Sequence, residues 1–164
     1  MPPRRPDPRG PDSVAAVLRA LDAGASPDPE AQRVAARYLL QVLAACHPGR
    51  ALEVRIPPVA AVQCLPGPAH ARGTPPNVVE TDPLTWIRLA AGRLDWAEAV
   101  RSGTVHASGP RADLAVYLPL LGALSTVGCE YGRKARANGF LGTMPGYGED
   151  RCEVSITRTF VTAL

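Results

Sequence analysis

Histidine and cysteine are the side chains of this 164-residue chain best suited to nucleophilic or metal chemistry. They are His47, His70, His106, Cys46, Cys64, Cys129 and Cys152. No two cysteines form a C-x-x-C pair, and none has a histidine at the spacing of a zinc ligand set. The histidines are far apart in the sequence, and no G-x-S-x-G nucleophile motif is present. The sequence therefore predicts no catalytic residues, no metal site and no cofactor, and we expect a protein that is not an enzyme.

The composition is that of a globular protein with a modest positive charge. Apolar residues make up 46% of the chain and charged residues 20%, and the formal net charge is +3. That charge is too small to favour nucleic acid as a partner. The sequence contains neither a signal-like apolar stretch nor a run of about 18 apolar residues that could span a membrane. We expect a cytoplasmic protein with reduced thiols; transient contact with a membrane and the oligomeric state are left open.

Two amphipathic helices are expected at the start of the chain. Residues 1–12 contain five prolines and predict a disordered arm rich in proline and arginine. A helix should begin after Asp12 or Ser13 and end at Gly24, and a second should run from Pro29 to about His47.

The hydrophobic period then changes from that of helices to that of strands. Residues 51–56 alternate between apolar and charged side chains, and residues 59–65 and 77–81 are further candidate strands. The proline-rich residues 66–76 between them predict a loop.

Helix-capping residues mark two short helices in the second half of the chain. Asp82 can cap a helix that starts at Pro83 and ends at Gly92, and Asp95 with Glu98 can cap another that runs to Gly103. A strand over 104–108 and a last helix over 111–121 should follow. Because strands and helices come in separate runs, the order predicts an α+β fold.

An ordered series of motifs lies within these elements. It consists of Asp82, the segment Leu89-Ala90-Ala91-Gly92-Arg93-Leu94-Asp95, and the turns Ser102-Gly103 and Ser108-Gly109. Together with the upstream stretch 53–83, this series resembles the bacterial branch of the sterol carrier protein type 2 superfamily over about residues 13–121. The resemblance implies a small mixed sheet of four to five strands, covered on one face by helices.

The same resemblance implies a non-enzymatic carrier domain for an apolar ligand such as a lipid, a fatty acyl chain or a sterol-like molecule. The candidate pocket-lining residues are Trp86, Trp96, Val100, Leu114 and Leu118. Aromatic and aliphatic residues at helical spacing also suit an ordinary core, so that interpretation stays open for each of them. Two other functions remain open: an accessory domain or subunit of an isomerase that uses a small thiol, and a ligand-free protein-interaction module.

Residues 122–164 do not resemble the family. We treat them as a C-terminal extension of unknown role, in which the alternation from Cys152 to Val161 predicts a strand. Residues 13–121 are expected to fold by themselves.

Overall fold

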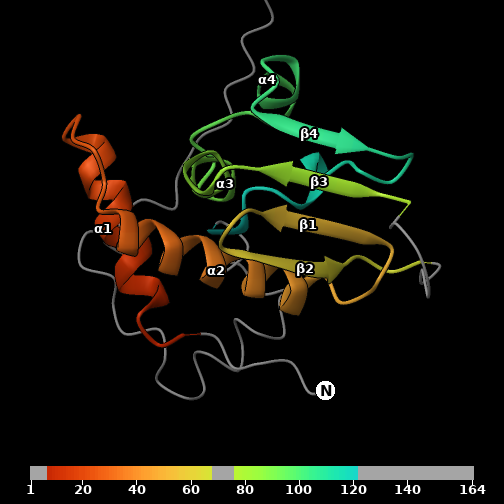
Figure 1. The fold of residues 1–164 in the computed structure, drawn as a ribbon, viewed down its shortest axis with the longest axis horizontal. Helices are drawn as coiled ribbons and strands as arrows, with labels where there is room; N and C mark the ends of the chain where they lie inside the picture. Colours follow the sequence, from red (N-terminus) through yellow and green to blue (C-terminus); the bar gives the residue numbers. More distant parts are fainter. Residues whose placement is uncertain (1–6, 68–75, 122–164) are drawn as a thin grey trace, which may run out of the picture.

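A computed structural model describes residues 7–67 and 76–121 of the chain. These residues form four α-helices, four strands and a short 3-10 helix (Figure 1). The elements are α1 (Gly10–Asp22), α2 (Pro29–Cys46), β1 (Leu52–Ile56), β2 (Ala60–Cys64), β3 (Val78–Thr81), α3 (Pro83–Ala90), α4 (Trp96–Arg101), β4 (Val105–Ser108) and η1 (Ala115–Tyr117). The predicted α+β class is confirmed.

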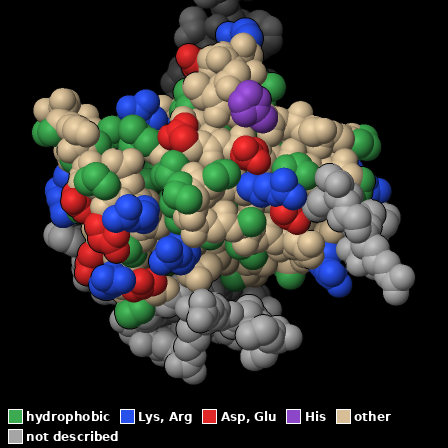
Figure 2. All heavy atoms as spheres, in the orientation of Figure 1, with side chains coloured by type: hydrophobic (Ala, Val, Ile, Leu, Met, Phe, Trp, Pro, Cys, Tyr) green, Lys and Arg blue, Asp and Glu red, His purple; other side chains and the backbone are tan. Residues whose placement is uncertain are grey.

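The four strands form one mixed sheet in the order β2-β1-β3-β4. β1 pairs antiparallel with β2 and parallel with β3, and β4 pairs antiparallel with β3. Along β1, Leu52, Val54 and Ile56 are buried on one face, because side chains alternate between the two faces of a strand. Glu53 and Arg55 lie on the opposite face and form an ion pair. Figure 2 views the sheet from this second face, where charged side chains lie over the strands.

The helices cover the apolar face of the sheet. α2 runs behind β1 and β2 in Figure 1 and contacts α1, β2 and α3. It begins where the sequence predicts, because the carboxylate of Asp28 accepts the backbone N–H of Ala31 at 2.8 Å and Pro29 occupies the first helical position. Its apolar stripe, which includes Leu39, Leu40 and Leu43, is fully buried against the sheet and α3.

Both predicted caps in the second half of the chain are confirmed. Asp82 Oδ1 accepts the backbone N–H groups of Leu84 and Thr85, and Asp95 Oδ1 accepts that of Glu98. α3 is followed by Gly92, whose φ of +70° places it in the left-handed region that ends many helices.

The prediction for the first helix is wrong at its start. α1 begins at Gly10, with Arg9 at the N-cap and no side-chain capping bond, so residues 10–12 are helical instead of part of a disordered arm. The cause is a tertiary contact: a Cβ on Gly10 would come within 2.2 Å of the Tyr38 ring. This close approach of α1 to α2 requires glycine, which capping rules cannot reveal.

The prediction of a helix over 111–121 is also wrong. Ala115–Tyr117 forms a 3-10 turn, in which Asp113 Oδ1 accepts the backbone N–H of Ala115, and helical structure is present again only at Leu120 and Leu121. Pro119 lacks the N–H that an α-helix would pair with the carbonyl of Ala115, and its ring would clash with that carbonyl. The apolar periodicity of the segment nevertheless has a role, since Leu114 and Leu120 are fully buried.

Three predicted features lie outside the described residues. They are the first half of the N-terminal arm, most of the proline-rich loop with His70, and the extension 122–164 with its strand from Cys152 to Val161.

Candidate functional site

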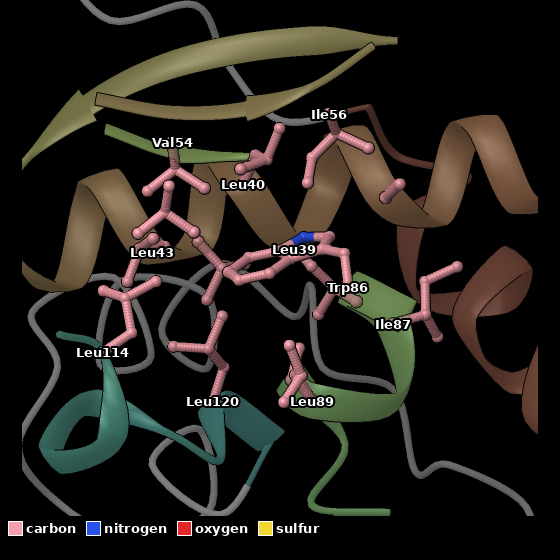
Figure 3. Close-up of a cluster of buried hydrophobic side chains, with 14 of the residues drawn as sticks. Leu39, Leu40, Leu43, Val54, Ile56, Trp86, Ile87, Leu89, Leu114 and Leu120 are labelled. Carbon is pink, nitrogen blue, oxygen red and sulfur yellow. The ribbon is translucent and has the colours of Figure 1, made fainter. Parts of the chain in front are cut away.

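The apolar interior of the molecule is centred on Trp86. Its side chain is fully buried and packs with leucines that come from three parts of the chain (Figure 3). They are Leu39 and Leu43 of α2, Leu89 of α3, and Leu114 and Leu120 of the last described segment. The indole Nε1 of Trp86 has no hydrogen-bond acceptor among the described residues. Burying an N–H group in this way costs about 1–3 kcal/mol.

The five predicted pocket residues lie in different environments. Trp86 and Leu114 are both fully buried and belong to the same core cluster, and the half-buried Leu118 packs against that cluster. Trp96 is half-buried at the first position of α4, whereas Val100 on the same helix is 40% exposed. Trp96, like Leu118, packs against the core cluster, so the structure brings four of the five together around the interior, and Val100 lies on the solvent side of α4.

The segment 109–121 closes this interior from the side opposite the sheet (Figure 3). Its start is held by Asn77, which is 6% exposed. The Asn77 Nδ2 group donates to the carbonyl of Ala51 at 2.8 Å, and Asn77 Oδ1 accepts the backbone N–H of Arg111 at 3.0 Å. Gly109 lies so close that a Cβ there would meet the Pro76 carbonyl at 2.1 Å. One buried amide thus joins the strand β1, the strand β3 and the closing segment.

A hollow of about 600 Å³ lies at the surface between α2 and the edge strand β2. Its lining residues are Arg37, Gln41, Val59, Ala60, Ala61 and Val62. Arg37 and Gln41 are four residues apart and therefore share one face of α2. The Oε1 atom of Gln41 is shielded from solvent and has no hydrogen-bond partner among the described residues. The sequence reasoning missed this hollow; two polar residues at helical spacing beside the apolar stripe of α2 were the available signal.

The described thiols and imidazoles do not form a reactive group. Burial raises the pKa of the Cys64 thiol to about 12, so it stays protonated and unreactive at neutral pH. Cys46 is disulfide-bonded, so the expectation of reduced thiols is wrong for this residue. Partial burial lowers the pKa of His47, and its ring packs edge-on against Tyr117. His106 is exposed on β4.

Within residues 7–67 and 76–121, no three of the potential metal-ligating side chains gather closely enough to hold an ion. None of the helices in this part of the chain is long and apolar enough to cross a bilayer.

Residues 28–120 match the family model described as bacterial SCP ortholog, where SCP stands for sterol carrier protein. The match covers more than half of the 164 residues. The chain belongs to this bacterial sterol carrier protein-like family. A search of curated proteins found no match. The family consists of carrier-type domains that are in general not enzymes. The resemblance stated from the sequence is therefore confirmed, and the matched region contains the whole sheet, the helices α2 to α4 and most of the closing segment.

Proposed function

We propose that this protein is a non-enzymatic carrier that binds an apolar small molecule, such as a fatty acyl chain or a sterol-like compound, in the interior beside Trp86. The observation that supports this proposal most is the construction of the closing segment 109–121. It contributes two fully buried leucines to the interior, and its regular structure is limited to the 3-10 helix Ala115–Tyr117 and to the helical residues Leu120 and Leu121. Residues 109–114, which include the buried Leu114, form neither helix nor strand, so they can be displaced without breaking one.

The ligand would take the place of Leu114 and Leu120 in the core. Burying each leucine contributes about 1.5–3 kcal/mol, and each methylene of a ligand contributes about 0.8 kcal/mol. An eight-carbon chain would therefore little more than replace the leucines that it displaces. A chain of twelve or more carbons or a sterol ring system brings enough additional apolar surface to bind. A polar oxygen of such a ligand could accept the unpartnered Nε1–H of Trp86.

A fluorescent long-chain fatty acid, 12-(9-anthroyloxy)stearic acid, tests this proposal. We expect micromolar binding to the wild-type protein. Leu118→Trp should weaken binding about tenfold, because a larger side chain would fill space beside the core. Val116→Trp is the matched control: it lies on the same segment, its side chain is 83% exposed, and affinity should not change. A sterol probe, dehydroergosterol, extends the test to ring systems. Absence of binding by both probes to the folded wild-type protein would reject the carrier function.

A protein-interaction module without a ligand is the second candidate. The full burial of Trp86 and Leu114 favours this function, because an interior that side chains already fill is stable without a bound ligand. Under this alternative neither probe binds, and the substitution at Leu118 lowers only the free energy of unfolding.

A further inference from the structure

The polar side chains in the hollow between α2 and β2 have few partners of their own. The guanidinium of Arg37 forms no ion pair with the described residues, whereas Arg33, one turn earlier on the same helix, is paired with Glu30 at 2.8 Å. The carboxylate of Asp7 interacts electrostatically with Arg37, but its hydrogen bonds are to Arg9, at 3.0 Å for the Nη2 atom.

Gln41 adds hydrogen-bonding capacity next to this charge. Its shielded Oε1 atom has no partner in the described part of the chain. The carboxamide carries both an acceptor and two donors, and a half-turn about its last side-chain bond exchanges their positions. A buried amide oxygen without a partner is unusual in proteins, because such atoms are nearly always hydrogen-bonded.

The opposite wall of the hollow is apolar. Val59, Ala60 and Val62 are half-buried and pack against the core with part of their surface, and the remaining surface faces solvent. β2 is the edge strand of the sheet, so this wall is not covered by another described strand. A volume of about 600 Å³ lies within the range of sites for small organic ligands, about 300–1,000 Å³.

We propose that this hollow is a second binding site, separate from the interior, for an anionic amphiphile: the carboxylate or phosphate oxygens of its head group bind Arg37 and Gln41, and its apolar part lies on Val59, Ala60 and Val62. Arginine suits this role because its planar guanidinium can donate two parallel hydrogen bonds to one oxyanion. Amphiphiles of this kind exist both as free fatty acids and as membrane lipids, and the chemistry of the head group is the same for both.

Octanoate is the most suitable probe because its chain is too short to displace the interior leucines, so its binding reports on the hollow alone. We expect octanoate to shift the backbone amide signals of residues 59–62 and the side-chain amide of Gln41 in nuclear magnetic resonance spectra of the full chain. Arg37→Gln should weaken octanoate about tenfold, the loss expected for a charge-assisted hydrogen bond. Octanol, which has the same chain length and no charge, should bind more weakly than octanoate to the wild-type protein.

Arg88→Gln provides the matched control, because Arg88 is an exposed arginine on α3 outside the hollow and its replacement changes the net charge equally. This variant should bind octanoate like the wild-type protein. Thermal unfolding of each variant confirms that it is folded. Equal affinities of the wild-type protein and Arg37→Gln, or equal losses in the two variants, would overturn the proposal.

Vesicles distinguish the two sources of the ligand. Binding to phosphatidylcholine vesicles that depends on added phosphatidylglycerol and on Arg37 would assign the site to a membrane lipid. Octanoate binding without such vesicle binding would assign it to a free amphiphile. If neither octanoate nor the vesicles bound, the site in the hollow would be rejected. The proposed carrier function of the interior would not be affected, since that function is measured with long-chain and sterol probes.

Discussion

Asn77 Oδ1 accepts the backbone N–H of Arg111 at 3.0 Å, and this hydrogen bond joins two residues that are 34 positions apart. It connects the residue before β3 to the start of the segment that closes the interior. The same side chain donates to the carbonyl of Ala51, so its amide satisfies both a buried acceptor and a buried donor. Asparagine is suited to this position because its amide can donate and accept at once.

Replacing Asn77 with alanine should therefore destabilise the protein by about 2–3 kcal/mol. The variant would leave the N–H of Arg111 and the carbonyl of Ala51 without partners, and each buried polar group without a partner costs about 1–3 kcal/mol unless water reaches it. Guanidinium chloride denaturation measures the free energy of unfolding directly.

Gln63→Ala is a suitable control for this experiment. Gln63 also carries an amide, which accepts from the Nε of Arg50 at 2.9 Å, but the contact is exposed. Its loss should change the free energy of unfolding by less than about 0.5 kcal/mol. Similar losses for the two variants would show that the buried amide of Asn77 has no special role.

The local signals of the sequence were sufficient for much of the fold. Asp82 and Asp95 cap their helices as predicted, because a cap needs only the few residues around it. The alternation in residues 51–56 identified both β1 and its buried face. The α+β class and the mixed sheet followed from the order of the elements and the family resemblance, and both are confirmed.

The features that the sequence did not predict depend on contacts between distant residues. Nothing near Gly10 indicates that Tyr38 will pack against it. Asn77 was included only as the first residue of a strand, since its partners Ala51 and Arg111 are brought to it by the fold. Predicting the hollow would have required knowing that α2 packs beside β2, and no local sequence pattern indicates this. Periodicity at 111–121 correctly marked buried leucines but wrongly indicated one continuous helix, because Pro119 interrupts it before Leu120.

The closing segment offers a direct comparison of a buried and an exposed apolar residue. Leu114 is completely buried, whereas Val116, two residues later, is 83% exposed. We expect Leu114→Ala to lower the free energy of unfolding by about 2–5 kcal/mol, the range for leucine in a packed core. Val116→Ala should change it by less than about 0.5 kcal/mol. A small effect of Leu114→Ala would mean that the segment is not packed on the interior in solution.

The last prediction concerns the pH dependence of stability and rests on His47. Its ring is half-buried and lies 4.8 Å from that of Tyr117, centre to centre. Burial disfavours the charged imidazolium and lowers the pKa of His47 in the folded protein from its ordinary value of 6.5. As the pH falls through 6.5, the unfolded chain therefore takes up a proton before the folded protein does. The contribution of His47 to the free energy of unfolding is therefore fully present above pH 6.5. It decreases as the pH falls from 6.5 to the lower pKa that His47 has in the folded protein.

Urea denaturation between pH 8 and pH 5 should show this loss in the wild-type protein. The carboxylates of Asp7 and Asp22 do not interfere, because ion pairs lower their pKa values below 3.8 and they titrate at more acidic pH. His47→Phe keeps an aromatic ring against Tyr117 but cannot be protonated, so its stability should depend less on pH in this range. His106→Phe removes an exposed histidine and should retain the wild-type pH dependence. If His106→Phe instead removed the pH dependence of the free energy of unfolding and His47→Phe did not, His106 and not His47 would be responsible for it.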